Sequence, residues 1–365
     1  AARWKQAAGV LFLRIPLVNP DAFLQRTADL VRPMFTRVAF CLWAVLMMAS
    51  MWVLVLRWDS FKSPMQSLLT NNNLLFLWVA LIGLKVIHEF GHAYACKIFG
   101  GKVPEMGAFL IAFTPCAYVD ASSAWGFSTT RRRVIVSLAG MYFESIVAAF
   151  ALLYWNWSHN AWLSSCAHQI VILSSVVTVG FNINPLMRYD GYYVLSDLVG
   201  IPNLRQRSVE FVQNVAKRWV LGLPVSPSGE SRRVCCLLFV YGIASSVYKV
   251  TLVLAICGMI AMKFYLLGLG LAVFFMVSVV GTALRRLIVY LWRSAETQPV
   301  RLRAVAVSLF MIVLVPAVIA AVPVPGVVVV DGIVQTEDDR VVYAQSSGFL
   351  QEVLLSAGQP VLQSE

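Results

Sequence analysis

Charged side chains are scarce in this chain. Asp, Glu, Lys and Arg make up 13% of its 365 residues, hydrophobic residues make up 59%, and the mean hydropathy is +0.75. Soluble domains carry about 25% charged residues, so the composition excludes an ordinary soluble protein of this size. It is typical of a protein that crosses a membrane several times.

Acidic residues are the scarcer kind: 18 Asp and Glu stand against 29 Lys and Arg, which gives a net charge of +11. Such an excess occurs in nucleic-acid-binding proteins and in the cytoplasmic loops of membrane proteins. No nucleic-acid-binding motif accompanies the charge here. We therefore expect no nucleic acid partner, and a lipid bilayer around the chain.

Cysteine and histidine are also few. The seven cysteines are odd in number and include no C-x-x-C pair, so a disulfide framework is not expected. Two of the four histidines, His159 and His168, fall at the outer end of an apolar run and are expected to be interfacial or core residues. A long basic segment precedes the first apolar run, so we expect no cleavable signal peptide there.

Long apolar runs predict an all-α polytopic membrane domain over residues 38–322, with about seven transmembrane helices. Residues 1–37 are expected to form a cytoplasmic or interfacial segment, in which a short amphipathic helix runs from Asn19-Pro20-Asp21 to Val31. The expected spans are Val38–Leu56, Leu74–Phe99, Val134–Tyr154, Ala161–Phe181, Val234–Ala261, Tyr265–Leu291 and Ala304–Val322.

Loop charge predicts the orientation of these spans. If the N-terminus is cytoplasmic, the inner loops hold most of the basic residues, including Arg131-Arg132-Arg133, and the outer loops hold few, such as Arg57 and Lys62. The positive-inside rule therefore favours a cytoplasmic N-terminus. Arg131–Arg133 is interpreted first as a topology signal and second as a lipid headgroup site.

The chain changes character after Pro325. Short β-branched runs, Val327–Val330 and Arg340–Tyr343, are separated by Asp-Gly and Ser-Ser-Gly turn signals. We expect residues 323–365 to begin an extracytoplasmic β-rich domain that continues beyond the residues given.

One of the apolar runs contains a group of ionisable residues. His88, Glu89 and His92 lie within Leu74–Phe99, where a charged side chain costs roughly 2.5–3.5 kcal/mol at mid-membrane. The histidines at i and i+4 share a helical face, and the glutamate completes the H-E-x-x-H pattern of zinc peptidases. Lys85 offers Glu89 an i,i+4 ion pair as an alternative, but it does not explain the histidines.

Catalytic zinc needs a third protein ligand and an open position for water. At ~1.5 Å per residue His88 lies roughly 20 Å from the outer end of its span, near the cytoplasmic face. The fourth span ends at the same depth, where Pro185 disfavours helix and Gly191 frees the backbone to turn. We predict Asp190 as the third ligand; Cys96 is the alternative, although the helical face has rotated by ~80° between positions 88 and 96.

Other residues near these motifs have more than one interpretation. Glu144 can orient a ligand histidine, or it can be a structural partner of Lys85 or Lys249. Asp120 is expected to be a turn or cap residue. Tyr192 and Tyr193 are expected to be interfacial anchors rather than substrate contacts.

These motifs resemble the site-2 protease family of intramembrane zinc metalloproteases. The likeness rests on His88-Glu89-x-x-His92, on Asn182-x-x-Pro185-x-x-x-x-Asp190-Gly191, and on Ala139-Gly140, where Met141 and Glu144 replace the Pro and Asn common in the family. Asn19–Leu30, Pro115–Trp125 and Arg188–Tyr193 resemble a subgroup of peptide zinc metalloproteases that are joined to a haemolysin-D-type membrane-fusion adaptor region. Val342–Gln363 resembles the first half of the lipoyl-like domain of that region.

The resemblance implies one catalytic Zn²⁺ held by His88, His92 and Asp190, with Glu89 as general base and then acid. Asn182 would steady the substrate backbone or the oxyanion, and the Gly100–Trp125 loop would pair with unwound substrate as an added strand.

The expected protein is an endopeptidase of the bacterial inner membrane that cleaves a peptide or membrane-anchored protein near the cytoplasmic face. Components of an export channel or transporter would be further partners. The alternative is a non-proteolytic scaffold or adaptor subunit of a peptide or efflux export system. A metal-ion carrier is a weaker option, because zinc ligands alone supply no path through the membrane.

Overall fold

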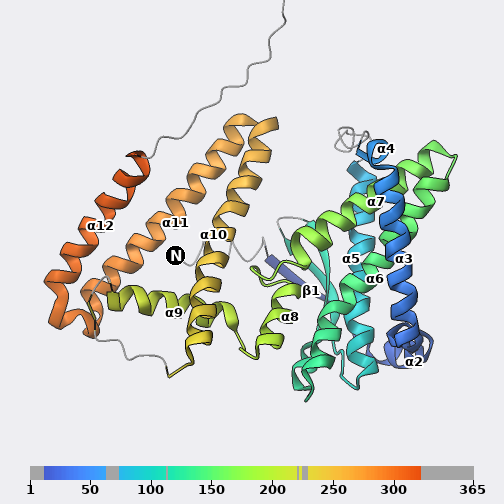
Figure 1. Cartoon of the computed structure of the whole chain (residues 1–365), viewed down its shortest axis with the longest axis horizontal. Helices are drawn as coiled ribbons and strands as arrows, with labels where there is room; N and C mark the ends of the chain where they lie inside the picture. Colours follow the sequence, from blue (N-terminus) through green and yellow to red (C-terminus); the bar gives the residue numbers. More distant parts are fainter. Residues whose placement is uncertain (1–11, 63–73, 112–113, 220–221, 224–228, 322–365) are drawn as a thin grey trace, which may run out of the picture. The chain divides into compact units, whose positions relative to one another are not determined.

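The computed structural model describes residues 12–62, 74–111, 114–219, 222–223 and 229–321 (Figure 1). The chain forms two compact units, Ala1–Ser308 and Leu309–Glu365, and of the second only residues 309–321 are described. The expected β-rich domain at 323–365 lies outside the described residues.

Six helices are long and apolar enough to cross a membrane, and they match the first six spans expected from the sequence. The membrane-embedded character predicted from composition is therefore supported by the fold. The seventh expected span, Ala304–Val322, coincides with helix α12 (Arg301–Ala321), which is not among the six, so its crossing stays a prediction. The six are α3 (Arg37–Leu56), α5 (Leu74–Ile98), α6 (Thr130–Trp157), α7 (Ala161–Ser175) with its π-helical continuation η5 (Val176–Asn182), α10 (Arg232–Lys263) and α11 (Tyr265–Arg293).

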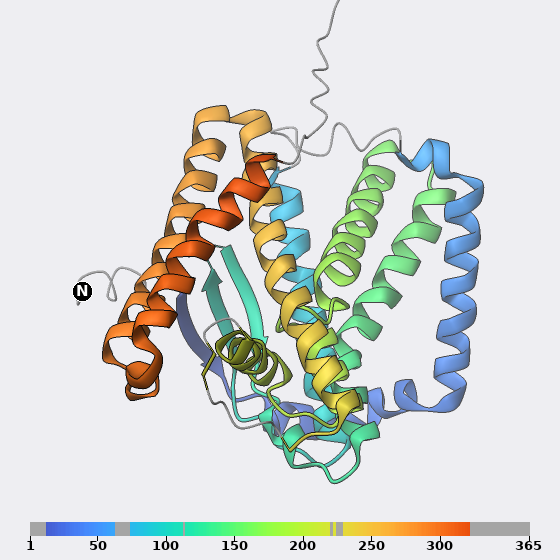
Figure 2. The same cartoon turned by 60° about the vertical axis from the view of Figure 1, so that its left-hand side comes forward.

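The expectation of an all-α membrane domain needs correction, because two strands within residues 38–322 pair with one strand from residues 1–37 in a three-stranded antiparallel sheet (Figure 2). Its strands are β1 (Phe12–Val18), β2 (Met106–Ile111) and β3 (Thr114–Val119), in the order β1-β2-β3. β3 packs against α5 and pairs only with β2 among the described strands, so it is an edge strand.

Helix α6 is the centre of the membrane bundle and contacts α3, α5, α7 and the short helix α8 (Asp190–Val199) (Figure 1). It approaches α5 so closely that a Cβ added to Gly91 would lie 2.5 Å from the Ala139 carbonyl oxygen. Small residues are what allow two membrane helices to pack backbone against backbone. Gly91 and Ala139 therefore fix the spacing between the two helices that flank the site.

The amphipathic helix predicted near the N-terminus is α2 (Asp21–Val31), and it packs on the C-terminal half of α5. Its own residues Leu24 and Ala28 are buried. Asp21 accepts hydrogen bonds from Lys97 Nζ at 2.8 Å and from the Val103 amide at 2.9 Å. The Lys97 ammonium and this amide lower the pKa of Asp21 below its ordinary value of 3.8, because both stabilise the ionised carboxylate.

The break expected at Pro185 is present. After η5 the chain leaves helical geometry and re-enters it at α8, and Tyr241 of α10 donates a hydrogen bond to the Pro185 carbonyl at 2.6 Å. Tyr192 is only 3% exposed and packs with residues of α9 (Leu204–Trp219) and α10, so its expected role as an interfacial anchor is wrong. The remaining short elements are η1 (Arg32–Phe35), α4 (Trp58–Lys62), η4 (Ser122–Gly126) and η6 (Ala295–Val300).

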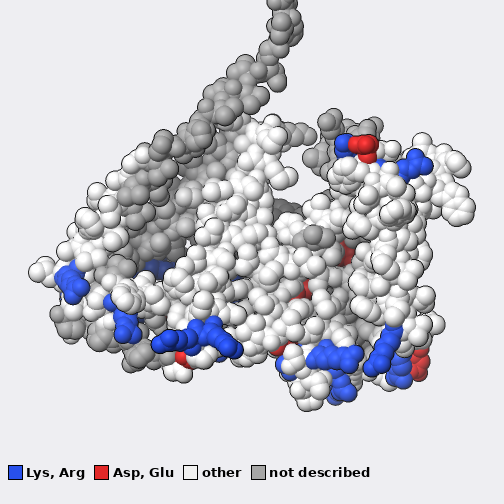
Figure 3. Space-filling view, viewed as in Figure 1, with Lys and Arg blue, Asp and Glu red and all other residues white. Residues whose placement is uncertain are grey.

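Basic residues are unevenly distributed between the two ends of the bundle. α3 and α6 begin, and α5 ends, at the same side, which places Arg37, Lys97 and Arg131–Arg133 together there. Arg57 and Lys62 lie at the opposite end. Figure 3 shows this gathering of Lys and Arg along the lower edge of the molecule.

Candidate metal centre

Three predicted ligands from two separate elements meet beside α6. His88 and His92 lie one turn apart on α5, and Asp190 is the first residue of α8, where the chain turns back after the broken helix. The two Nε2 atoms are 3.1 Å apart; Asp190 Oδ2 is 2.9 Å from His88 Nε2, and Asp190 Oδ1 is 3.4 Å from His92 Nε2. The predicted convergence of these side chains is present in the fold.

Both imidazoles are held by their other ring nitrogen. His92 Nδ1 lies 2.7 Å from the carbonyl oxygen of Val136, which can only accept, so Nδ1 carries the proton and Nε2 presents a lone pair. His88 Nδ1 lies 2.8 Å from Glu144 Oε2 and donates in the same way. Two lone pairs and a carboxylate therefore face one another in a largely buried place, an arrangement that a cation would stabilise.

The spacing of these atoms fits a tetrahedral ion. Ligand atoms roughly 2.0–2.2 Å from such a metal lie about 3.3 Å from one another. The two Nε2 atoms are 3.1 Å apart, and the two Asp190 oxygens lie close to this range, Oδ2 at 2.9 Å from His88 Nε2 and Oδ1 at 3.4 Å from His92 Nε2. His88, His92 and Asp190 thus form a cluster that can hold a metal ion.

Gly140 of α6 leaves room for the ion. A Cβ added to this residue would lie 2.5 Å from His92 Nε2 and 2.6 Å from His88 Nε2, against the very atoms that face the third ligand. Ordinary contacts begin at 3.4 Å, so any larger residue here would displace the imidazoles. Of the Ala139-Gly140 pair singled out in the sequence, Gly140 is therefore required by this geometry.

Glu144 is a partner of His88 and not of Lys85 or Lys249. Its side chain is fully buried, and Oε1 has no hydrogen-bond partner among the described residues. A buried carboxylate with a single neutral donor is poorly compensated. A cation bound one imidazole away would supply the missing positive charge, as in carboxylate–histidine–metal arrangements.

A cavity of about 330 Å³ opens onto two of the ligands, His92 and Asp190, and onto Glu89. Glu89 is partly buried, and no ion pair joins it to Lys85 in the part of the chain that the structure describes. Water and a substrate group can therefore reach the metal position and this carboxylate from the same side. The remaining lining residues are Val119, Asp120, Ala121, Ser122, Ala124, Trp125, Arg133, Val136, Ser137, Tyr193 and Asp197.

Several cavity residues were given another role by the sequence, and Asp197 was given none. The rings of Trp125 and Tyr193 meet edge-on with centroids 5.5 Å apart, and the Arg133–Asp197 ion pair spans 2.7 Å. Tyr193 thus lies against the cavity rather than at an interface. Asp120 does form the expected turn, with Oδ1 accepting from the Ser122 amide at 3.1 Å, but it also lines the cavity.

Other candidates lie away from the cavity. Asn182 is 5% exposed, and its Nδ2 is 3.5 Å from His88 Nδ1, so it touches a ligand histidine rather than the open space. Cys96 is fully buried, its sulfur lies 3.2 Å from Ser123 Oγ, and it is not part of the metal cluster. His168 is buried and donates to the Phe61 carbonyl at 2.7 Å, as expected for a core histidine.

The fold and the site define a mostly helical protein of membrane-embedded type with a buried His-His-Asp cluster that can hold a metal ion. Compared with known proteins, the chain matches no family model, no curated protein and no solved structure.

Proposed function

We propose that this chain is an intramembrane zinc metalloendopeptidase of the site-2 protease type, which hydrolyses a peptide bond in a peptide or membrane-anchored substrate. The observation that carries the proposal is the meeting of His88, His92 and Asp190 beside a cavity that also contains Glu89. Two neutral imidazoles and one carboxylate suit zinc better than magnesium or calcium, which prefer oxygen ligands. Three protein ligands leave the fourth position of a tetrahedral ion open.

The proposed chemistry assigns one role to each group. Zinc would supply Lewis acidity, lowering the pKa of water to about 7 and polarising the scissile carbonyl. Glu89 takes a proton from the attacking water while the water oxygen bonds to the carbonyl carbon. The same carboxyl then gives that proton to the amide nitrogen as the C–N bond breaks. Glu144 holds His88 in the tautomer that keeps Nε2 free.

The edge strand β3 supports the proposed mode of substrate binding. A helical peptide must unwind before its backbone can be attacked, and an extended segment can add to an open sheet edge. β3 has such an edge and packs against α5, the helix that carries Glu89. We expect unwound substrate to lie along β3 as it enters the cavity.

The charge distribution supports a cytoplasmic position for the site. The ligands lie toward the C-terminal end of α5, the same end of the bundle as Arg37 and Arg131–Arg133. By the positive-inside rule this end faces the cytoplasm. We therefore propose cleavage near the cytoplasmic face of the bacterial inner membrane.

The test is Glu89→Gln in the full chain, purified in detergent with zinc content measured. The probes are single-span reporter proteins with a different epitope tag on each side of the span. We expect the wild type to cleave at least one reporter and Glu89→Gln to cleave it about 10²–10⁴-fold more slowly at unchanged zinc content.

A matched control is Glu230→Gln, which makes the same chemical change in an exposed ion pair with Arg207 and should cleave at the wild-type rate. Full activity of Glu89→Gln would overturn the mechanism. Stoichiometric zinc with no cleavage of any reporter would favour the scaffold alternative over the enzyme.

A further inference from the structure

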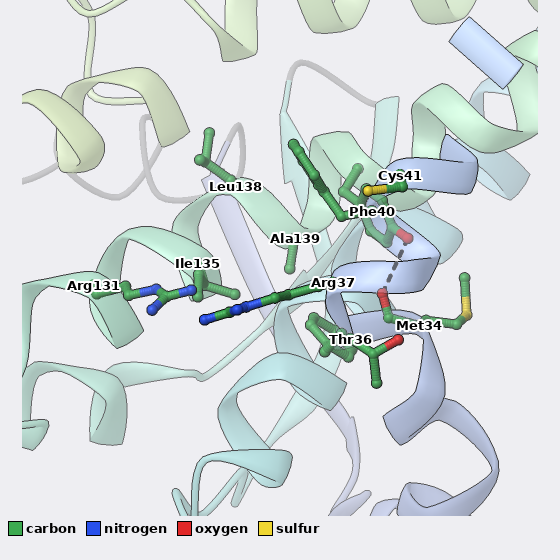
Figure 4. Close-up of a pocket in the computed structure, with 11 residues that line it drawn as sticks. Met34, Thr36, Arg37, Phe40, Cys41, Arg131, Ile135, Leu138 and Ala139 are labelled. Carbon is green, nitrogen blue, oxygen red and sulfur yellow. Dashed lines mark hydrogen bonds between the residues drawn. The ribbon is translucent and has the colours of Figure 1, made fainter. Parts of the chain in front are cut away.

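A second pocket, of about 510 Å³, lies between α3 and α6, away from the metal-site cavity (Figure 4). Its walls are mostly apolar, with Phe40 of α3 and Ile135 and Leu138 of α6 among them. Phe40 and Leu138 are 58% and 40% exposed. Ser50 is the only buried residue of α3, so this helix presents an apolar face to its surroundings. In a membrane-embedded chain, that face meets lipid.

The only charged groups of the pocket are two arginines at one end of it. Figure 4 shows the side chains of Arg37 and Arg131 reaching toward each other across the gap between the helices. Neither has a hydrogen-bond or ion-pair partner among the described residues. The next two residues after Arg131 do have partners: the Arg132 guanidinium lies over the Phe99 ring, and Arg133 pairs with Asp197 at 2.7 Å.

The helix ends around these arginines add to the positive charge. Arg37 is the first residue of α3 and Arg131 the second of α6, and neither helix has an acidic residue in its first turn. The N-terminus of a helix is itself partly positive. Two guanidinium groups and two helix ends therefore share this place, and no acidic side chain is among the residues that line it.

The pocket extends along helix α6. Its lining on α6 runs from Arg131 to Tyr142, which is about 16 Å at the rise of an α-helix. The Tyr142 hydroxyl donates to the Met34 carbonyl at 3.0 Å and joins the two sides of the pocket. The site is thus charged at one end and apolar along its length.

We propose that this pocket binds an anionic phospholipid, with its phosphodiester on Arg37 and Arg131 and an acyl chain along Phe40, Ile135 and Leu138. Guanidinium groups bind phosphate through paired N–H donors, and basic residues at the end of a membrane helix attract acidic headgroups. A free phosphate would leave the apolar groove unused. A transmembrane helix of a partner would leave the two charges without a counterion.

The test measures lipid retained by the full chain. The protein is purified in detergent and exchanged into nanodiscs of phosphatidylcholine with a minor fraction of labelled phosphatidylglycerol. It is then re-extracted, and bound lipid is counted by native mass spectrometry. We expect about one phosphatidylglycerol per wild-type chain, and retention weaker by on the order of tenfold in Arg37→Gln/Arg131→Gln. Glycerol phosphate should not compete at the same concentration.

Three further proteins separate lipid binding in this pocket from a general effect of net charge and from a general effect of a tryptophan on α6. Arg232→Gln/Arg233→Gln removes the same charge from the start of α10, outside this pocket, and should retain lipid like the wild type. Leu138→Trp fills the groove and keeps both arginines, so it should also lose the lipid. Phe150→Trp, on an exposed part of the same helix, should not.

Equal retention of phosphatidylcholine and phosphatidylglycerol would overturn the proposal. So would equal retention by the wild type and the Arg37→Gln/Arg131→Gln protein. A dimer that Leu138→Trp dissociates would assign the groove to a second copy of the chain instead.

Discussion

Replacement of Gly140 by alanine is the sharpest test of the metal centre, because it adds one methyl group and removes no ligand. That methyl would lie 2.5 Å from His92 Nε2 and 2.6 Å from His88 Nε2, about 0.9 Å inside the closest ordinary contact. Loss of a group that merely orients a ligand lowers metal affinity about 10–100-fold. Displacing both ligand imidazoles at once should lower zinc affinity by at least about 100-fold.

The protein should nevertheless fold. Alanine is the better helix former by about 1 kcal/mol, and overpacking of one methyl costs about 1–3 kcal/mol, so the net change in stability without metal is small. We expect Gly140→Ala to keep its helical circular dichroism and to lose zinc. Zinc affinity is measured by competition with a chelator of known affinity.

The matched control is Gly83→Ala on α5, where an added Cβ would meet no heavy atom within 4 Å. It makes the same substitution in the helix that carries both histidines and should leave zinc affinity unchanged. If Gly140→Ala bound zinc as tightly as the wild type, the ion would have to lie elsewhere than between the two Nε2 atoms.

Two further predictions concern Glu144, which orients His88, and the Asp21–Lys97 ion pair, which joins α2 to α5. Glu144→Ala should weaken zinc binding about 10–100-fold, because His88 loses the acceptor that orients it. Glu144→Gln keeps an acceptor oxygen and should lose less zinc affinity. Equal zinc affinities for the wild type and both variants would contradict this role of Glu144. The pKa of Asp21 is lower in the folded chain than its ordinary value of 3.8. Its ion pair with Lys97 should therefore stabilise the fold above pH 3.8, and this stabilisation should be lost as the pH falls through the folded pKa. The difference in thermal stability between the wild type and Asp21→Asn should therefore shrink on acidification. A stability difference that does not change with pH would show that it does not come from ionisation of Asp21.

Much of the site could be predicted from local signals. Apolar run length predicts six of the helices, and Asn19-Pro20-Asp21 marks the start of α2. The spacing of His88 and His92 places both on one face, and Pro185 explains why the chain turns where Asp190 begins α8. These features depend on residues that are close together in the sequence.

The features that were missed depend on distant contacts. β1 pairs with β2, which lies about ninety residues later, so no local pattern distinguishes Phe12–Val18 from a surface segment. Tyr192 was assigned to an interface because it follows a span, but α9 and α10 cover it. The need for glycine at position 140 arises from two histidines on another helix.

One helix separates the two sites through its residue spacing. Val136, Gly140 and Glu144 recur at intervals of four and all contact the ligand histidines. The pocket toward α3 is lined by other residues of α6, at 131, 135, 138, 139 and 142. At about 100° per residue the mean directions of the two sets are about 155° apart, on nearly opposite sides of the helix. Leu138→Trp and Gly140→Ala therefore act on different sites although they are two residues apart, and each tests its own site without touching the other.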